Sequence, residues 1–400
     1  MARTILQQAC KNAAVVHIVA DTHPEGPNIK DVEHDLREQN ALPSCSSYCI
    51  GPSQKRPADL KSAWRSPQFK KGLFIFLKDE WMSQVYAPII AGHQLYFALE
   101  NECYLYTSDG KVVSRTQVRP LESGHTEADT RVIFHAQFVA QVHDKPPVIV
   151  IRSDDTDVFI LLVYHCRFIS SHLWMDAGVD SKNTRRMIDV SHLANILTSR
   201  VCDALPSFHA LTGCDYTASF MRKAKWRPFQ IMKNSEIFTA AISKLGDTDV
   251  IDQDVSAVVE EYLCSVYGAR NVSGVNEARL QLFNKLYAPK RTNDPLEKLK
   301  TSDPCCMPPC QKVLQQKLRR TNFVAFVWKN AREAKPVAFG PEGHGWEVEK
   351  GRMKLLWFSG PSVPANIEIE SSDLLSEEDN EEEIDIQESY SSDEEEDPDF

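Results

Sequence analysis

The sequence predicts a layered α/β fold, because short apolar runs alternate along the chain with segments of helical periodicity. Residues 15–20 and 148–152 are near-continuous, β-branched apolar runs, which are typical of strands buried on both faces. Between residues 126 and 143 apolar residues recur at the spacing of an α-helix, at Ala128, Val132, Ala136, Val139 and Ala140. We therefore expect a layered α/β domain that contains parallel strands.

Further elements follow from the same patterns. Residues 102–106 and 111–113 flank the turn sequence at 108–110 and indicate a β-hairpin. The apolar run at 158–163 predicts another buried strand, and residues 190–205 predict a helix.

Composition divides the chain into three parts. Residues 1–235 carry the α/β pattern, with an insert at about 41–70 that is rich in Pro, Ser and basic residues and indicates a loop. Residues 236–360 are more helical and predict an accessory region. Residues 361–400 have acidic runs and little apolar matter, so they cannot offset their ordering entropy and are expected to be disordered.

The net charge of −11 conceals a division between the body and the tail. Of the 56 acidic residues, 17 lie in residues 366–400, which contain no Lys or Arg. Residues 1–365 therefore carry 45 basic and 39 acidic side chains, a net charge of +6. A basic body is compatible with a nucleic-acid partner, and the acidic tail could bind a basic protein or compete with phosphates.

Several classes of protein are disfavoured. No apolar run approaches the roughly 20 residues that a membrane helix needs, and the first apolar stretch leads to His17 and Asp21, not to a signal-peptide cleavage site. The 11 cysteines are irregularly spaced, and those at 305, 306 and 310 do not match a zinc motif, so no zinc is expected. We expect a nuclear or cytoplasmic protein that has no membrane partner.

Acidic residues cluster at the ends of the predicted elements, at 126–130, 153–158 and 211–216, with one more after the first strand. These candidate ligands are Asp21, Glu127, Asp129, Asp155, Asp157 and Asp215. Ligands of α/β sheets bind at the carboxyl ends of strands, and gathered carboxylates repel one another unless a cation lies between them. Mg²⁺ and Mn²⁺ prefer such oxygen ligands, and two ions roughly 4 Å apart can promote phosphodiester hydrolysis.

Each cluster also has a structural interpretation. Residues 126–129 fit a helix capping box, residues 153–157 fit a turn after a strand, and residues 213–215 fit a helix end. Taken singly, these structural interpretations are favoured. The occurrence of all three clusters in this order favours a metal site.

The three clusters resemble a known family. Glu127-Ala128-Asp129, Asp155-Thr156-Asp157 and Gly213-Cys214-Asp215-Tyr216 are similar to the E-A-[E/D], D-x-D and G-x-D-Y motifs of the flap-endonuclease/XPG-type superfamily of PIN-like nucleases. The resemblance spans about residues 121–220. Residues 153–158 and 209–216 are also similar to a group of uncharacterised animal proteins that are suspected of mobile-element ancestry.

The resemblance implies a PIN-like three-layer fold with a central, mainly parallel sheet, and it implies roles for individual residues. The implied catalytic residues are Glu127, Asp129, Asp155 and Asp157. Asp157 and Asp215 would hold a second Mg²⁺ or Mn²⁺ ion, and Asp21 would take the place of the family's acid after an early strand. Lys30 and Arg37 would contact the scissile phosphate, although a solvated helix face fits them equally well.

Two departures from the family pattern stand out. The family has another aspartate on a strand before the Asp21 position, so the chain resembles an N-terminally shortened member. After Tyr216 the family has a Gly-rich segment, which this chain replaces with cations that could bind phosphates: Arg222, Lys223, Lys225 and Arg227. Trp226 could stack on a base, or the segment could be an amphipathic helix with a buried Trp.

Two functions are therefore expected as alternatives. The first is divalent-metal-dependent hydrolysis of nucleic-acid phosphodiesters, with DNA favoured over RNA. The second is a catalytically inactive, nuclease-like protein that binds nucleic acid or another protein. The intact set of acids favours the first function, and the missing first-strand aspartate favours the second.

Overall fold

The computed structural model describes residues 1–11, 13–22, 26–29, 50–52, 54–64, 66–179, 182–269, 271–287, 306–337 and 339–360. The chain divides into two units, Met1–Phe358 and Ser359–Phe400. Lys30, Arg37 and the predicted disordered tail at 361–400 lie outside the described residues.

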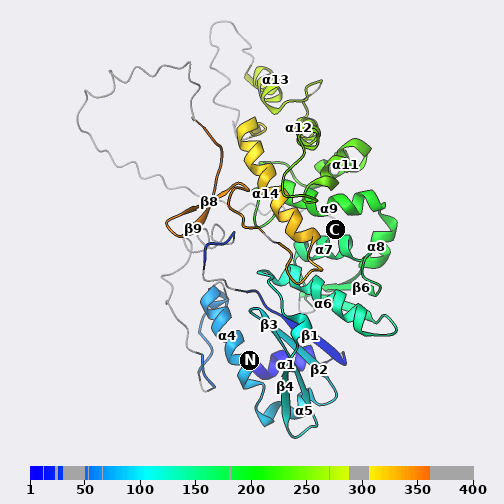
Figure 1. Cartoon of the computed structure of the whole chain (residues 1–400), viewed down its shortest axis with the longest axis vertical. Helices are drawn as coiled ribbons and strands as arrows, with labels where there is room; N and C mark the ends of the chain where they lie inside the picture. Colours follow the sequence, from blue (N-terminus) through cyan, green and yellow to red (C-terminus); the bar gives the residue numbers. More distant parts are fainter. Residues whose placement is uncertain are drawn as a thin grey trace, which may run out of the picture. The chain divides into compact units, whose positions relative to one another are not determined.

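Four strands near the N-terminus form one sheet in the order β1-β2-β3-β4 (Figure 1). The strands are β1 (Val15–Val19), β2 (Gln94–Leu99), β3 (Glu102–Ser108) and β4 (Val113–Gln117). β1 runs parallel to β2, whereas the other pairs are antiparallel. The predicted hairpin is confirmed, since Ser108 pairs with Val113 across it.

Short helical elements lie around and beside this sheet. They are α1 (Ala2–Ala9), α3 (Leu60–Ala63), α4 (Pro67–Glu80), η1 (Gln84–Tyr86), α5 (Ala87–Ile90) and η2 (Arg119–Leu121). Leu6 of α1, Leu77 of α4 and Phe97 of β2 belong to one buried cluster.

The prediction of a loop at about 41–70 is wrong at Leu60–Ala63, which form α3, and from Pro67 onward, where α4 begins. Two local capping bonds account for the difference. Asp59 accepts a hydrogen bond from the N–H of Ser62 at the start of α3, and Ser66 accepts one from Phe69 at the start of α4. Pro67 suits the first turn of α4, where its missing N–H costs nothing.

A second sheet has the order β5-β6-β7. It contains β5 (Val148–Arg152), β6 (His172–Ala177) and β7 (Arg186–Asp189), with β5 parallel to β6 and β7 antiparallel to it. The strand at 148–152 is confirmed, but its burial on both faces is wrong, because Val148 and Val150, which share one face of β5, are 65% and 52% exposed. The α/β class is confirmed; the described strands form mixed sheets.

The apolar run at 158–163 is not a strand but the middle of helix α7 (Thr156–His165). Asp155 begins this helix by accepting a hydrogen bond from the N–H of Asp157 at 2.8 Å. Helix α7 contacts several neighbouring helices, so apolar residues occur on more than one of its sides. A short apolar run in such a helix cannot be distinguished by its sequence from a buried strand.

Helix α6 (Ala128–Val142) confirms the predicted helix at 126–143. The helix predicted at 190–205 is instead two helices, α8 (Val190–Ile196) and α9 (Ser199–Thr212). The break occurs because Thr198 is extended and its side chain caps α9 by accepting from the N–H of Val201.

The remainder of the first unit is mainly helical. It comprises α10 (Trp226–Lys233), α11 (Glu236–Lys244), α12 (Gln253–Tyr267), α13 (Val275–Tyr287), α14 (Gln311–Lys329), β8 (Trp346–Glu349) and β9 (Arg352–Leu355). Helix α14 packs against α7 and α9 (Figure 1). Phe323 and Trp328 of α14 share one buried cluster with Ile133 of α6 and Leu161 of α7. Residues after 236 therefore complete the core behind the acidic motifs.

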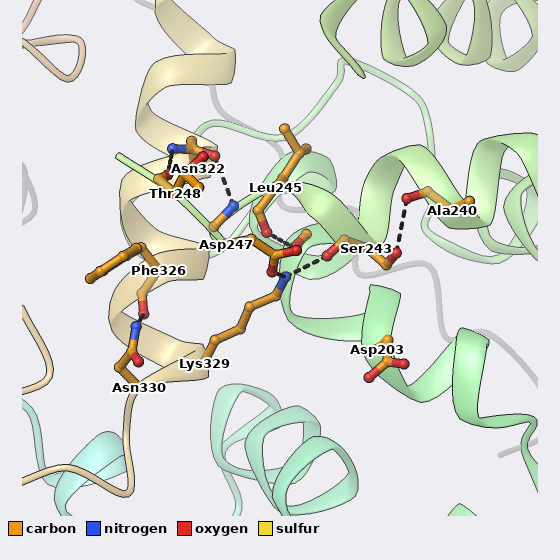
Figure 2. A network of polar contacts seen from close by, with 12 residues as sticks. Asp203, Ala240, Ser243, Leu245, Asp247, Thr248, Asn322, Phe326, Lys329 and Asn330 are labelled. Carbon is orange, nitrogen blue, oxygen red and sulfur yellow. Dashed lines mark hydrogen bonds and ion pairs between the residues drawn. The ribbon is translucent and has the colours of Figure 1, made fainter. Parts of the chain in front are cut away.

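Polar contacts tie the loop between α11 and α12 to α14 (Figure 2). The Asn322 amide accepts a hydrogen bond from the N–H of Gly246 at 2.7 Å and donates to the carbonyls of Thr248 at 2.8 Å and Asp249 at 2.9 Å. Gly246 has a φ of +82°, and a Cβ there would lie 2.6 Å from the backbone of Ala325. The loop is thus closely fitted to the helix.

The helices of the described residues are not membrane spans. No helix in this part of the chain is long and apolar enough to cross a bilayer. Even α14, with 19 residues, carries Lys312, Lys317, Arg319 and Arg320.

Candidate metal site

The N-terminus of α6 gathers the first acidic residues. Glu127 is the N-cap and Asp129 lies in the first turn. Asp21, two residues after β1, accepts a hydrogen bond from the N–H of Ala128 through Oδ1 at 2.9 Å. The positive end of the helix dipole favours carboxylates at this position. The Asp21 carboxylate therefore lies at the end of α6, although more than 100 residues separate them in sequence.

The turn between β5 and α7 places the second cluster. The Ser153 hydroxyl accepts from the N–H of Asp155 at 3.1 Å, and Asp155 Oδ1 accepts from the N–H of Asp157 at 2.8 Å. The expected strand-end turn is therefore present. It directs Asp155 and Asp157 toward α6, and of the two only Asp157 is buried.

The two clusters converge on one point. Asp129, Asp155 and Asp157 each contribute one carboxylate oxygen, and these three oxygens lie within 4.8 Å of one another. Among the described residues, these three form the group that could hold a metal ion. All three donors are hard oxygens, which suit Mg²⁺ or Mn²⁺ better than zinc. The donor set fits the predicted type of ion.

Electrostatics at the cluster favour a cation. Partial burial raises the pKa of the Asp155 carboxyl, and the neighbouring charges of Asp157 and Asp215 raise it further. The three acids therefore repel one another in the absence of a positive charge. A cation between them would remove this repulsion.

The third motif begins where α9 ends. Gly213 has a φ of +123°, and a Cβ at this position would lie 2.8 Å from Ser219, so only glycine fits. Cys214 and Thr217 then exchange backbone hydrogen bonds of 3.1 Å, which closes a tight turn around Asp215 and Tyr216.

Tyr216 links this turn to the other acids. Burial raises the pKa of Tyr216 well above its ordinary value, and the charges of Asp129, Asp21 and Asp215 add to the effect. These acids therefore act electrostatically on the Tyr216 hydroxyl. Asp21, Glu127 and Asp215 are not members of the three-ligand group.

Sequence reasoning missed a polar chain behind Asp157. His209 Nε2 lies 2.8 Å from Asp157 Oδ1, and Lys225 Nζ lies 2.8 Å from His209 Nδ1 and 2.6 Å from the Gly213 carbonyl oxygen. We expected Lys225 to bind phosphate. The only sequence signal was the position of His209 within the 209–216 phrase; nothing local connects it with Lys225.

The remaining predicted phosphate contacts lie after the third motif. Arg222 and Arg227 are exposed, and Lys223 Nζ lies over the Tyr267 ring at 4.7 Å. Trp226 begins α10 and is 62% exposed, so the expected alternative of a buried Trp is wrong.

Comparison with known proteins adds no relative of this site. No family model, curated protein or solved structure matches the chain. The functional assignment therefore depends on the converging carboxylates and on the motifs that contain them.

Proposed function

We propose that Asp129, Asp155 and Asp157 bind a divalent cation, Mg²⁺ or Mn²⁺, and that the chain hydrolyses nucleic-acid phosphodiesters at this point. The observation that carries the proposal is the convergence of three carboxylates from two separate elements to within 4.8 Å. Structural capping alone would not require Asp129 of α6 to meet the turn that begins α7. The three-ligand group accommodates one ion, and Asp215, which was expected to hold a second ion together with Asp157, is not a member of this group.

A divalent cation supplies a Lewis acid that lowers the pKa of water and offsets the negative charge of the phosphoryl group. The chain's own contribution is to hold the ligands rigidly. Asp155 is fixed by its capping bond to the N–H of Asp157, and Asp157 is fixed by His209. Asp21 holds the end of α6 in place through Ala128.

The nucleic acid would bind beside the cluster along residues 213–227. Arg222 and Arg227 are exposed and can neutralise phosphates. The exposed ring of Trp226 can stack on an unpaired base, which favours a substrate with a single-stranded segment. We propose DNA as the preferred nucleic acid.

The test is a cleavage assay with branched and single-stranded DNA and RNA in the presence of Mg²⁺ or Mn²⁺. We expect cleavage by the unaltered chain, none by the double variant Asp155→Ala/Asp157→Ala, and unchanged cleavage by Asp144→Asn, which removes an exposed acid outside the cluster. Cleavage that survives the double substitution would refute the assignment. Metal-dependent binding of DNA without cleavage would support the inactive, nuclease-like alternative.

A further inference from the structure

A cation of the chain itself lies behind the acidic cluster. The Lys225 ammonium donates to the Gly213 carbonyl at 2.6 Å and lies 2.8 Å and 3.2 Å from the two ring nitrogens of His209. His209 is 5% exposed and contacts Asp157, which is 7% exposed. The three side chains thus form a continuous chain from the base of α10 to the cluster.

The chemistry of the donors sets the direction of these bonds. The Lys225 ammonium is close to both ring nitrogens of His209, so it lies over the face of the imidazole and does not donate in the plane of the ring. An ionised carboxylate can only accept, so His209 Nε2 carries the ring hydrogen and donates to Asp157 Oδ1 at 2.8 Å. Asp157 is left with its second oxygen for a ligand.

Lys225 is poorly placed to serve as a phosphate contact. It is half-buried at the N-cap of α10, and its ammonium bonds are internal. Burial lowers the pKa of Lys225, and the nearby charge of Asp157 opposes this shift. The basic residue is oriented toward the acids, although the sequence places it in a run of cations that could bind nucleic acid.

We infer that Lys225, held against His209, is a positioning residue that supplies a positive charge beside Asp157, so that the acidic cluster folds without metal and takes one divalent cation instead of two. The number of ions is the part of this inference that rests on the proposed function. The pairing of Lys225 with Asp157 does not depend on it.

The pairing is tested in metal-free buffer by thermal unfolding of four proteins: the unaltered chain, Lys225→Met, Asp157→Asn and the double variant. Removing one partner of a buried pair leaves the charge of the other partner uncompensated. We therefore expect Lys225→Met to lower Tm by about 2–4 °C. Asn at 157 can still accept from His209 but has no charge, so Lys225→Met should cost less than half as much in that background. Equal losses in both backgrounds would refute the pairing.

The number and affinity of ions are tested by calorimetric titration with Mn²⁺. The unaltered chain should bind one ion, and Lys225→Met should bind Mn²⁺ about tenfold more tightly, since a repelling charge is gone. Mere disruption of the site would weaken binding instead, and either weaker binding or two ions in the unaltered chain would overturn the inference. Lys244→Met, at an exposed position on α11, is the matched control and should leave Mn²⁺ affinity unchanged.

The two proposals fail in different ways. If the unaltered chain binds no Mn²⁺, the metal site and the one-ion assignment are both refuted, while the metal-free unfolding measurements still decide whether Lys225 is paired with Asp157. If Mn²⁺ binds but the losses are additive, the metal site stands and the role of Lys225 is refuted.

Discussion

Replacing Asp155 by Asn should separate the structural and the metal-binding roles of this residue. Asp155 is the N-cap of α7, where Asn serves as well as Asp. The substitution keeps the capping bond to the N–H of Asp157 and removes one charge from the three-carboxylate group. We therefore expect the variant to be more stable than the unaltered chain in metal-free buffer.

The size of this gain follows from the geometry. Two like charges at 4.8 Å, the upper limit of the oxygen separations in this group, repel by about 3.5 kcal/mol at an effective dielectric constant of about 20 and by about 0.9 kcal/mol in water. Asp155 is only partly buried and reaches solvent, so the lower value applies to each of its two neighbours, Asp129 and Asp157. The expected gain in the free energy of unfolding is about 1–2 kcal/mol.

The pH dependence has a defined sign. The pKa of Asp155 is raised in the folded chain, so the folded state holds its proton more tightly than the unfolded state does. The contribution of Asp155 to stability is therefore fully present below the ordinary carboxyl pKa and is lost as the pH rises through the raised value. Asp155→Asn should remove this part of the pH dependence.

The assay is urea unfolding at several pH values, with EDTA or with Mn²⁺. At a Mn²⁺ concentration of about 100 times Kd, the ion should stabilise the unaltered chain by about 2.7 kcal/mol, and the variant should lose most of this effect. Asp144→Asn is the control, since Asp144 is exposed and outside the cluster. A variant that is destabilised in EDTA, or that keeps the full response to Mn²⁺, would refute this account of the site.

Two further predictions concern the scaffold. Asn322→Ala should lower the free energy of unfolding in urea by about 2–4 kcal/mol, because it leaves the buried Gly246 N–H without its acceptor and two carbonyls without their donor. The control Asn330→Ala removes one bond to Phe326 and should lower it by less than about 1 kcal/mol. Equal losses in the two variants would contradict this role of Asn322. Burial lowers the pKa of His17 to about 4, so its contribution to stability should be present above about pH 6.5 and be lost as the pH falls toward 4. His17→Phe should flatten the fall of Tm over that range, whereas the exposed His143→Asn should not, and a parallel fall in both variants would exclude His17 as the cause.

The parts of the fold that the sequence predicts correctly are those with a local cause. The α6 periodicity and the turn sequence at 108–110 each determine an element without help from distant residues. The apolar run at 158–163 misleads because α6, α8, α9 and α14 all contact α7, and a helix with apolar residues on several sides loses the periodicity that identifies it. The exposure of Val150 could not be foreseen either, because a strand's own sequence does not reveal whether another layer covers each of its faces.

The candidate site shows the same division between local and distant causes. The order of the acidic motifs indicates which residues to compare, and three of the six acids do meet. The place of Lys225 depends on how the turn after Gly213 folds back upon α9, and this turn depends on a close approach of Gly213 to Ser219. Charge alone therefore assigned Lys225 to the phosphate-binding surface, whereas tertiary structure directs it to His209.

The structural and functional interpretations of the acids do not exclude each other, because a carboxylate has two oxygens. Asp21 uses Oδ1 to accept from Ala128, Asp155 uses Oδ1 to cap α7, and Asp157 uses Oδ1 to accept from His209. In Asp155 and Asp157 this bond orients the side chain through one oxygen, and the other oxygen can serve a ligand. The bonds that give these two acids a structural role are therefore the means by which the chain would hold a cation rigidly. Removing a hydrogen-bond partner, such as His209, should thus disturb the geometry of the cluster without removing a ligand.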